Sequence, residues 1–357
     1  MTSKTALVVG ITGISGSNVA DLLIEEGWTV HGLARRPPQD RPGVRPVAAD
    51  LLDPESLQAA VAGLDVSHVF FCSWARQETE EENCRVNGAM LRNVLDAVTV
   101  TSRLEHVALV TGLKHYLGPF ESYGKVKPDT PFREDQPRLP YQNFYYVQED
   151  ILLEAAARAG FAWSVHRPHT LIGWALGNAM NMGVTLAVYA AICKETGRPF
   201  LFPGTPQQYE AVTDVTDARI LARQLVWAST TPAAYNQAFN IVNGDVFRWR
   251  RLWVTIAADF GVAVAPYPGH PTPLDVQMAG QEATWDGIVA KYGLQPYALT
   301  TLASWWHTDA DLGRELETFT SMTKSREFGF HALQITERSF TDLFERLRRE
   351  KIIPLRG

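Results

Sequence analysis

A lysine and a tyrosine with complementary chemistry occur in two short stretches, TGLKHYLGPF and NFYYVQED. A phenol can donate a hydrogen bond to a developing oxyanion, and a nearby ammonium favours the charge that forms there. A catalytic tyrosine at the start of a helix often has a lysine four residues later, but here that position is Asp150. We therefore expect Tyr146 to be the hydrogen-bond donor, Lys114 to supply the cation from another part of the chain, and Tyr145 to turn into packing.

The elements that must position this pair alternate over the first 170 residues. The apolar runs predict strands at Ala6–Val9, Thr29–Leu33, Arg45–Ala48, His68–Cys72, Val107–Val110 and Trp163–His166. The amphipathic segments predict helices at Ser15–Glu26, Pro54–Ala62, Asn87–Ala97 and Tyr146–Ala159. This βαβ alternation predicts an α/β fold, a doubly wound parallel sheet of the Rossmann type whose ligands bind beyond the carboxyl ends of the strands.

After Pro168 the segments are longer and richer in aromatic residues. We expect residues 1–170 to form a dinucleotide-binding domain, with returning strands near residues 200–245, and residues 171–357 to form a smaller, mainly helical substrate-binding cap interleaved with it. The returning strands are expected at Phe200–Phe202 and Phe239–Val242, a buried helix at Met182–Cys193, and cap helices at Asp217–Ala228, Trp249–Phe260 and Phe340–Lys351.

The stretch VVGITGISG leads from the first strand into the first helix, with Gly10, Gly13 and Gly16 spaced three apart. Glycines at such a turn permit a tight bend, a close approach to a pyrophosphate and helix packing on the strand. The free N–H groups at the helix start then suit a phosphate. We expect this turn, including Thr12 and Ile14, to hold a dinucleotide.

The end of the second strand reads HGLARR, which bears on the choice of dinucleotide. Ala34 leaves space, and Arg35 and Arg36 could clamp a 2′-phosphate, which favours NADPH/NADP⁺; alternatively, both arginines are solvated surface charges. Asp50 and Leu51 follow the third strand. The Asp50 carboxylate could accept a hydrogen bond from the adenine amino group or cap the helix that begins near Pro54.

Further candidates for the cofactor wall follow the later strands. They are Ser73, Thr111, His169 and Leu171, the last two in RPHTLIGW. His115, His166 and His169 form a tempting cluster, but no metal-binding spacing accompanies them, so we expect structural histidines and no metal. The candidates for an apolar substrate pocket are Trp74, Phe120, Phe144, Met182, Phe328 and the Trp305–Trp306 pair.

Composition excludes several classes of protein. The net charge of −6 argues against a nucleic-acid surface, and the longest apolar run is too short to cross a bilayer. The sequence enters its first strand without room for a signal peptide, and its three cysteines have no paired spacing. We expect a cytoplasmic protein with free thiols and without nucleic-acid or membrane partners.

The pairing of TGLKHYLGPF with NFYYVQED resembles the progesterone 5β-reductase/iridoid synthase-like family, atypical short-chain dehydrogenases that reduce enones with NADPH. The resemblance continues through NCRVNGAMLRNVLDAV, MNMGVTLAVYAAICKETGRPFLFPG, AFNIVNGDVFRWRRLW and SMTKSREFGF. It implies that Tyr146 and Lys114 are the catalytic pair, that Thr12 and Arg35 contact the cofactor, and that the protein is a homodimer. The segment between Phe260 and Thr301 departs from the family, and there we expect substrate choice to be set.

The resemblance implies 1,4-reduction of an enone or enal C=C bond, with hydride delivered to the β-carbon and a small hydrophobic enone as substrate. Two other functions stay open. An extended short-chain dehydrogenase acting on a ketone or a sugar nucleotide would favour a Tyr-x-x-x-Lys pair, which is missing here because Asp150 occupies the lysine position. A non-catalytic NADP-sensing protein could lack a usable tyrosine–cation pair.

Overall fold

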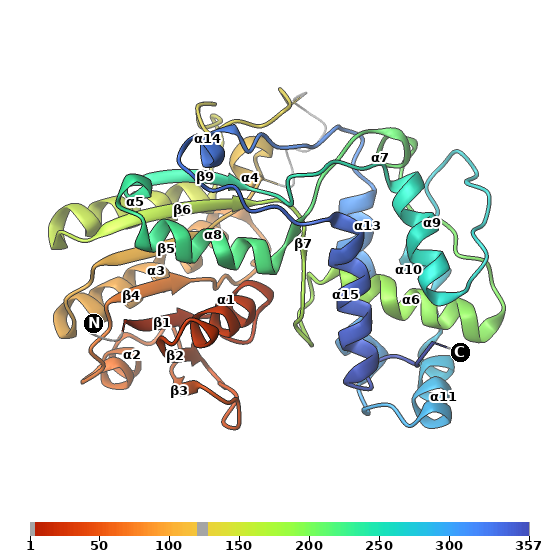
Figure 1. Cartoon of the computed structure of the whole chain (residues 1–357), viewed down its shortest axis with the longest axis horizontal. Coiled ribbons are helices and arrows are strands. Elements are labelled where there is room, and N and C mark those ends of the chain that lie inside the picture. Colours follow the sequence, from red (N-terminus) through yellow and green to blue (C-terminus); the bar gives the residue numbers. More distant parts are fainter. Residues whose placement is uncertain (1–3, 120–127, 357) are drawn as a thin grey trace.

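The computed structural model describes residues 4–119 and 128–356. Within these ranges, seven parallel strands form one sheet in the order β3-β2-β1-β4-β5-β6-β9 (Figure 1). The strands are β1 (Thr5–Val9), β2 (Thr29–Ala34), β3 (Val44–Ala48), β4 (His68–Phe71), β5 (His106–Val110), β6 (Ala162–Pro168) and β9 (Gln237–Ile241), and a separate parallel pair is β7 (Leu171–Ile172) with β8 (Thr216–Asp217). The reversal of strand order at β1 is that of a doubly wound Rossmann-type sheet, so the predicted fold class is confirmed.

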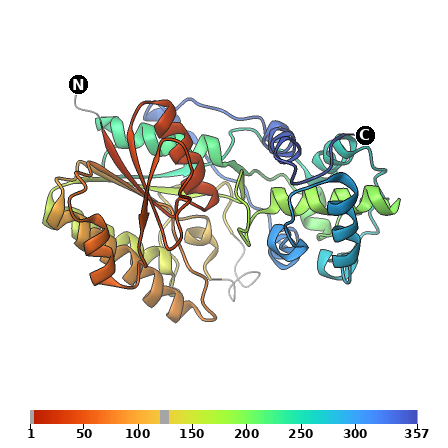
Figure 2. The same cartoon turned by 90° about the horizontal axis from the view of Figure 1, so that it is seen from below.

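Helices cover both faces of the sheet, as Figure 2 shows from below. One face carries α1 (Ile14–Glu25) packed beside α8 (Ala218–Thr230), and the other carries α2 (Pro54–Val61), α3 (Glu80–Thr101) and α5 (Phe144–Ala159). Each face has its own apolar cluster, which explains why the central strands are near-continuous hydrophobic runs.

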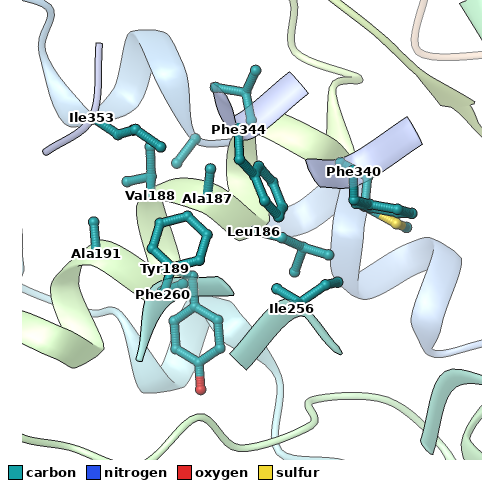
Figure 3. Packing of buried hydrophobic residues seen from close by; sticks show 14 of the residues in the cluster. Leu186, Ala187, Val188, Tyr189, Ala191, Ile256, Phe260, Phe340, Phe344 and Ile353 are labelled. Atoms are coloured by element: carbon teal, nitrogen blue, oxygen red, sulfur yellow. The ribbon is translucent and has the colours of Figure 1, made fainter. Parts of the chain in front are cut away.

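The other half of the molecule is a helical cap built on α6, which is buried along most of its length. Figure 3 shows Leu186 and Tyr189 of α6 in one apolar cluster with Ile256 and Phe260 of one cap helix and Phe340 and Phe344 of another. The cap helices are α6 (Met182–Thr196), α7 (Pro206–Glu210), α9 (Trp249–Phe260), α10 (Leu274–Gln277), α11 (Glu282–Tyr292), α12 (Leu299–Leu302), α13 (Trp305–Leu312) and α15 (Thr336–Arg349), and the short helices nearer the sheet are α4 (Lys114–Leu117), α14 (Thr323–Glu327) and the 3₁₀ turn Pro232–Ala234.

Two expectations for the second half of the chain are wrong. The segment Phe200–Phe202 does not extend the sheet; Phe200 makes one isolated bridge to Val264 and stacks on Trp253 with ring centroids 4.2 Å apart. The aromatic side chains of this segment pack in the cap core, and this packing overrides the local strand propensity. Helix α8 does not belong to the cap, because its apolar stripe packs against the sheet beside α1. The division at residue 170 stays a prediction.

Helix α3 begins at Glu80 rather than at the predicted Asn87. Thr79 caps it, its side chain accepting a hydrogen bond from the Glu82 N–H, and three glutamates occupy the first turn, where the helix dipole favours negative charge. The extra turns bring Glu80 to the carboxyl edge of the sheet. Among the described residues, no helix combines the length and apolar character needed to cross a membrane.

Candidate active site

A groove with a volume of about 930 Å³ lies across the carboxyl ends of the first strands, and we call it the strand-end groove. Loops after parallel strands meet at one edge, which is why residues distant in sequence converge here. The structure places nine of the expected cofactor residues in its wall: Gly10, Thr12, Gly13, Ala34, Arg35, Arg36, Asp50, Leu51 and Ser73.

The glycine turn is shaped to let a phosphate approach α1. Gly10 has φ +85°, a conformation that L side chains rarely adopt. A methyl group at Gly16 would overlap the Gly10 carbonyl oxygen, so Gly16 lies behind the groove and lets the helix pack on the turn. Gly13 is the N-cap and offers no side-chain acceptor to the first-turn N–H groups. This helix start therefore fits an anion.

The two arginines after β2 are exposed at the wall of the strand-end groove. Asp50 also lines the groove, and its carboxylate accepts a hydrogen bond from the Leu52 N–H at 3.0 Å. The alternative role of Asp50 as the cap of α2 is wrong, because Asp53 caps that helix and accepts from the Ser56 N–H at 3.1 Å.

A second cavity of about 280 Å³, which we call the inner cavity, continues from the groove. Trp74, Arg76 and Trp306 belong to the walls of both, and the Arg76 guanidinium lies 4.1 Å from the Trp306 ring centroid. The expected residues that line the inner cavity are Gly13, Ile14, Ser73, Trp74, Thr111, Lys114, Phe144, His169, Leu171 and Trp306.

The two adjacent tyrosines have exchanged the orientations that we expected. Tyr145 lines the inner cavity, and a methyl group added at Gly112 would lie 3.1 Å from its hydroxyl oxygen. Tyr146 points away: its hydroxyl donates to the His115 carbonyl at 2.6 Å and accepts from the Leu139 N–H at 3.0 Å. Burial raises the pKa of the Tyr146 phenol. The expected placement of Tyr146 in the cavity is therefore wrong.

The physical reason is the start of the helix. Asn143 caps α5, its side chain accepting from the Tyr145 N–H at 3.0 Å, so the helix begins at Phe144. Successive residues of a helix differ by about 100° around its axis, so only one of the two tyrosines can face the cavity. The position four residues after Tyr145 is Glu149, which is also a carboxylate.

Lys114 is buried at the inner cavity and forms an ion pair with Glu80, its Nζ lying 2.5 Å from Oε2. The other oxygen of the Glu80 carboxylate accepts a hydrogen bond from the Phe144 N–H at 2.9 Å. Asn143 donates to the Lys114 carbonyl at 2.7 Å. The cation thus comes from the end of β5, as expected, and Glu80 joins it to the start of α5. Glu80 was not predicted as a site residue, although Thr79 and the acidic run after it were a helix-start signal.

The opposite side of α5 is fastened to the sheet by a buried carboxylate. Glu149 pairs with Arg167 of β6 at 3.0 Å and with Arg138 at 3.1 Å, and the His115 ring lies 3.7 Å away. Burial alone would raise the pKa of Glu149, but the neighbouring His115 ring and Arg167 charge lower it to about 2. Glu149 therefore stays ionised and fixes the rotation of α5 that turns Tyr145 toward the cavity.

The expected aromatic wall is only partly correct. Trp74 and Phe144 stack with ring centroids 5.7 Å apart and line the inner cavity. Met182 is buried in the cap cluster and Phe328 packs 5.5 Å from Phe239, so neither lies at the cavity, because each fills an apolar core. Phe120 lies outside the described residues.

Several residues of the inner cavity were not predicted. They come mainly from the cap side and are Asn178, Met180, His307, Asp311 and Arg314, together with Arg76 and Glu80. No spacing in the sequence marks them, because their convergence depends on where α13 is placed. His115, His166 and His169 have separate partners, and the described residues contain no group of three or more side chains that could hold a metal ion.

Comparisons with known proteins agree with this fold. A family model described as the PRISE-like Rossmann-fold domain matches residues 48–354. The chain belongs to this family. It is 41% identical over 366 residues to an (S)-8-oxocitronellyl enol synthase of Camptotheca acuminata, covering 98% of this chain and 93% of that protein. It is 40% identical over 363 residues to the 3-oxo-Delta(4,5)-steroid 5-beta-reductase of Arabidopsis thaliana, with the same coverage. The family resemblance found in the sequence is thereby confirmed.

Solved structures show the same fold at low identity. A UDP-glucose 4-epimerase of Thermus thermophilus in complex with NAD has a TM-score of 0.66 and 18% identity, covering 96% of this chain and 99% of that one. A putative epimerase of Burkholderia cenocepacia has a TM-score of 0.67 and 15% identity, with coverages of 98% and 99%. At these identities the likeness concerns the fold alone.

The buried ion pairs of Glu149 predict that the free energy of unfolding depends on pH. The pKa of Glu149 is about 2 in the folded protein, below the ordinary value of 4.5 for this side chain, so its stabilisation is present above about pH 4.5 and is lost as the pH falls toward 2. Glu149→Gln should lower the free energy of unfolding at pH 7 by roughly 3–5 kcal/mol, because it leaves Arg167 buried beside a neutral group. Urea unfolding at several pH values should show the difference from wild type shrinking below pH 4.5. Exposed Glu154→Gln is the matched control and should change stability far less. If the difference in free energy of unfolding between Glu149→Gln and wild type did not depend on pH, the stabilising role of the Glu149 ion pairs would be contradicted.

Proposed function

We propose that this protein catalyses the NADPH-dependent 1,4-reduction of the C=C bond of an activated enone or enal. The observation that carries the proposal is that Tyr145 and Lys114 line one cavity that opens from the strand-end groove. Relatives that are about 40% identical over nearly the whole chain are named as a steroid 5-beta-reductase and as enol synthases, and they support the same class of reaction here.

The residues of the inner cavity meet the needs of this chemistry. When bound with its nicotinamide in the cavity, NADPH supplies the hydride that goes to the β-carbon. The carbonyl oxygen of the substrate then gains enolate character, and we assign the Tyr145 hydroxyl to donate a hydrogen bond to it. The α-carbon then takes a proton from water, which completes the saturated product. The Lys114 ammonium adds positive potential, and Glu80 fixes its position. The stacked rings of Trp74 and Phe144 provide a flat apolar wall for the enone.

The groove supports NADPH as the cofactor. The residues of the glycine turn would hold the pyrophosphate at the start of α1, and Arg35 and Arg36 would bind the 2′-phosphate at the end of β2. Thr111, His169 and Leu171 lie where the nicotinamide half would meet the inner cavity. We also propose that the protein is a cytoplasmic homodimer; its three cysteines are free, which suits a reducing compartment.

The activity is tested by NADPH absorbance loss with 2-cyclohexen-1-one and with progesterone, followed by identification of the product. We expect a saturated ketone from at least one of the two. An allylic alcohol would instead support a carbonyl dehydrogenase, and the absence of NADPH consumption with either enone would support an NADP-sensing protein.

The two tyrosines can be separated by matched variants. Tyr145→Phe should lower kcat by about 10²–10³, the usual effect of losing one oxyanion donor. Tyr146→Phe should leave kcat within a few-fold of wild type, since its hydroxyl only joins α5 to the backbone of His115 and Leu139. Steady-state kinetics with circular dichroism as a folding control decides the matter. A severe loss of kcat in a folded Tyr146→Phe protein would refute the assignment.

Cofactor choice can be tested at the end of β2. The Arg35→Ala/Arg36→Ala protein should show a KM for NADPH raised by about tenfold or more, because charge-assisted hydrogen bonds to the 2′-phosphate are lost. The KM for NADH should change little. Arg103→Ala removes an exposed arginine outside the groove and serves as the control. An equal change in both KM values would mean that the two arginines do not read the 2′-phosphate.

A further inference from the structure

The cap side of the inner cavity is polar, unlike the aromatic side formed by Trp74 and Phe144. Three charged or titratable side chains of α13 and the loop after it line the cavity there, each about one tenth exposed: His307 at 13%, Asp311 at 10% and Arg314 at 10%. Thr170 lines it as well, from the turn between β6 and β7. A pocket built only for a hydrocarbon would gain nothing from burying these groups.

These side chains belong to one buried network. Asp214 accepts a hydrogen bond from His169 Nδ1 at 2.7 Å, and Arg314 donates to His169 Nε2 at 3.0 Å. Arg314 also pairs with Asp311, and the Asp311 carboxylate accepts from the Thr170 hydroxyl at 2.7 Å. His169 therefore links Asp214 to Arg314, and Asp311 links Arg314 to Thr170.

The formal charge of this buried network is negative. It contains two carboxyl groups, Asp214 and Asp311, against one guanidinium, Arg314, so its formal charge is −1. Burial raises the pKa of the Asp214 carboxyl; burial also acts on Asp311, but the neighbouring Arg314 charge lowers the pKa of that carboxyl. Burial lowers the pKa of His307, so that ring is neutral near pH 7 and does not change the count. Among the described residues, the other charged side chains that line the cavity form two groups of opposite charges: Arg76 and Glu78, which are exposed, and Lys114 and Glu80, which form an ion pair. A carboxylate on the ligand would therefore be repelled from this wall.

We propose that the substrate of this enzyme is an enone or enal that carries a hydroxyl group, which binds at the wall formed by His307, Asp311 and Arg314. A hydroxyl is neutral, donates to a carboxylate oxygen and accepts from a guanidinium or imidazole N–H, so it meets both halves of the Asp311–Arg314 pair. The inference rests on the proposed enone reduction and specifies its substrate class. His307, Asp311 and Arg314 are the specificity-determining residues.

The test compares three eight-carbon aldehydes that differ only at the far end of the chain: (E)-2-octenal, (E)-8-hydroxy-2-octenal and (E)-8-oxo-6-octenoate. We expect kcat/KM for the hydroxylated aldehyde to exceed that for the methyl-terminated one by about tenfold, the effect of a hydrogen bond to a charged group. The carboxylate should be the poorest substrate. A preference for the methyl-terminated aldehyde, equal rates for the two, or a preference for the carboxylate would each overturn the proposal.

Variants then locate the preference. Asp311→Leu/Arg314→Leu removes both charges together, which avoids leaving one of them buried alone. His307→Phe removes a polar group that lies 4.0 Å from Asp311 but keeps both members of the Asp311–Arg314 ion pair. Each should reduce or abolish the preference, measured as the ratio of kcat/KM for the hydroxylated aldehyde to that for (E)-2-octenal in the same protein, and exposed Glu315→Gln should keep the wild-type ratio. An unchanged ratio in both variants, including a case in which the KM for NADPH rises equally with every aldehyde, would overturn the assignment of this wall to the substrate.

A separate binding measurement distinguishes failure of this inference from failure of the proposed function. If none of the three aldehydes is reduced, enal reduction is wrong. Titration calorimetry of octanal and 8-hydroxyoctanal into NADP⁺-saturated wild-type protein then still measures whether the polar wall binds a hydroxyl group. Tighter binding of the hydroxylated ligand by about tenfold supports a hydroxyl-binding site, and equal or weaker binding overturns it.

Discussion

The Glu80 carboxylate is the contact on which the geometry of this site depends. One of its oxygens holds the Lys114 ammonium and the other holds the first N–H of α5, so two segments distant in sequence are tied to the start of α3. A carboxylate at a helix start is favoured by the helix dipole, and an ammonium is compact enough to sit beside it. The ammonium at the cavity thus comes from the end of β5 and not from α5.

The rotation of α5 is fixed from the opposite side by Glu149 and Tyr146. Glu149 binds the Arg167 guanidinium of β6, and the Tyr146 hydroxyl binds the backbone of His115. The tyrosine expected to be catalytic is therefore part of the support, and its neighbour faces the cavity. The adjacent carboxylates of α5, Glu149 and Asp150, both pair with Arg138, so the helix that lacks a lysine uses these two acidic residues for anchoring.

The parts of the molecule that follow from local patterns were predictable. The glycine turn, the strand ends and the alternation of elements depend on short-range chemistry, and the residues from Gly10 to Ser73 converge because parallel strands place their carboxyl ends at one edge. The orientation of Tyr145 was not predictable in this way, because a helix start displaced by two residues changes which side chain faces the cavity. Met182 and Phe328 were misplaced because an aromatic or aliphatic residue fits a core as well as a pocket. The polar wall of Asp311 and Arg314 depends on the packing of α13, which no local pattern encodes.

Trp74, Arg76 and Trp306 belong to the walls of both the strand-end groove and the inner cavity. A ligand in the strand-end groove therefore contacts the same three side chains as a ligand in the inner cavity. Their occupancies are then energetically linked, and thermodynamic reciprocity requires that the two ligands alter each other's affinity by the same factor.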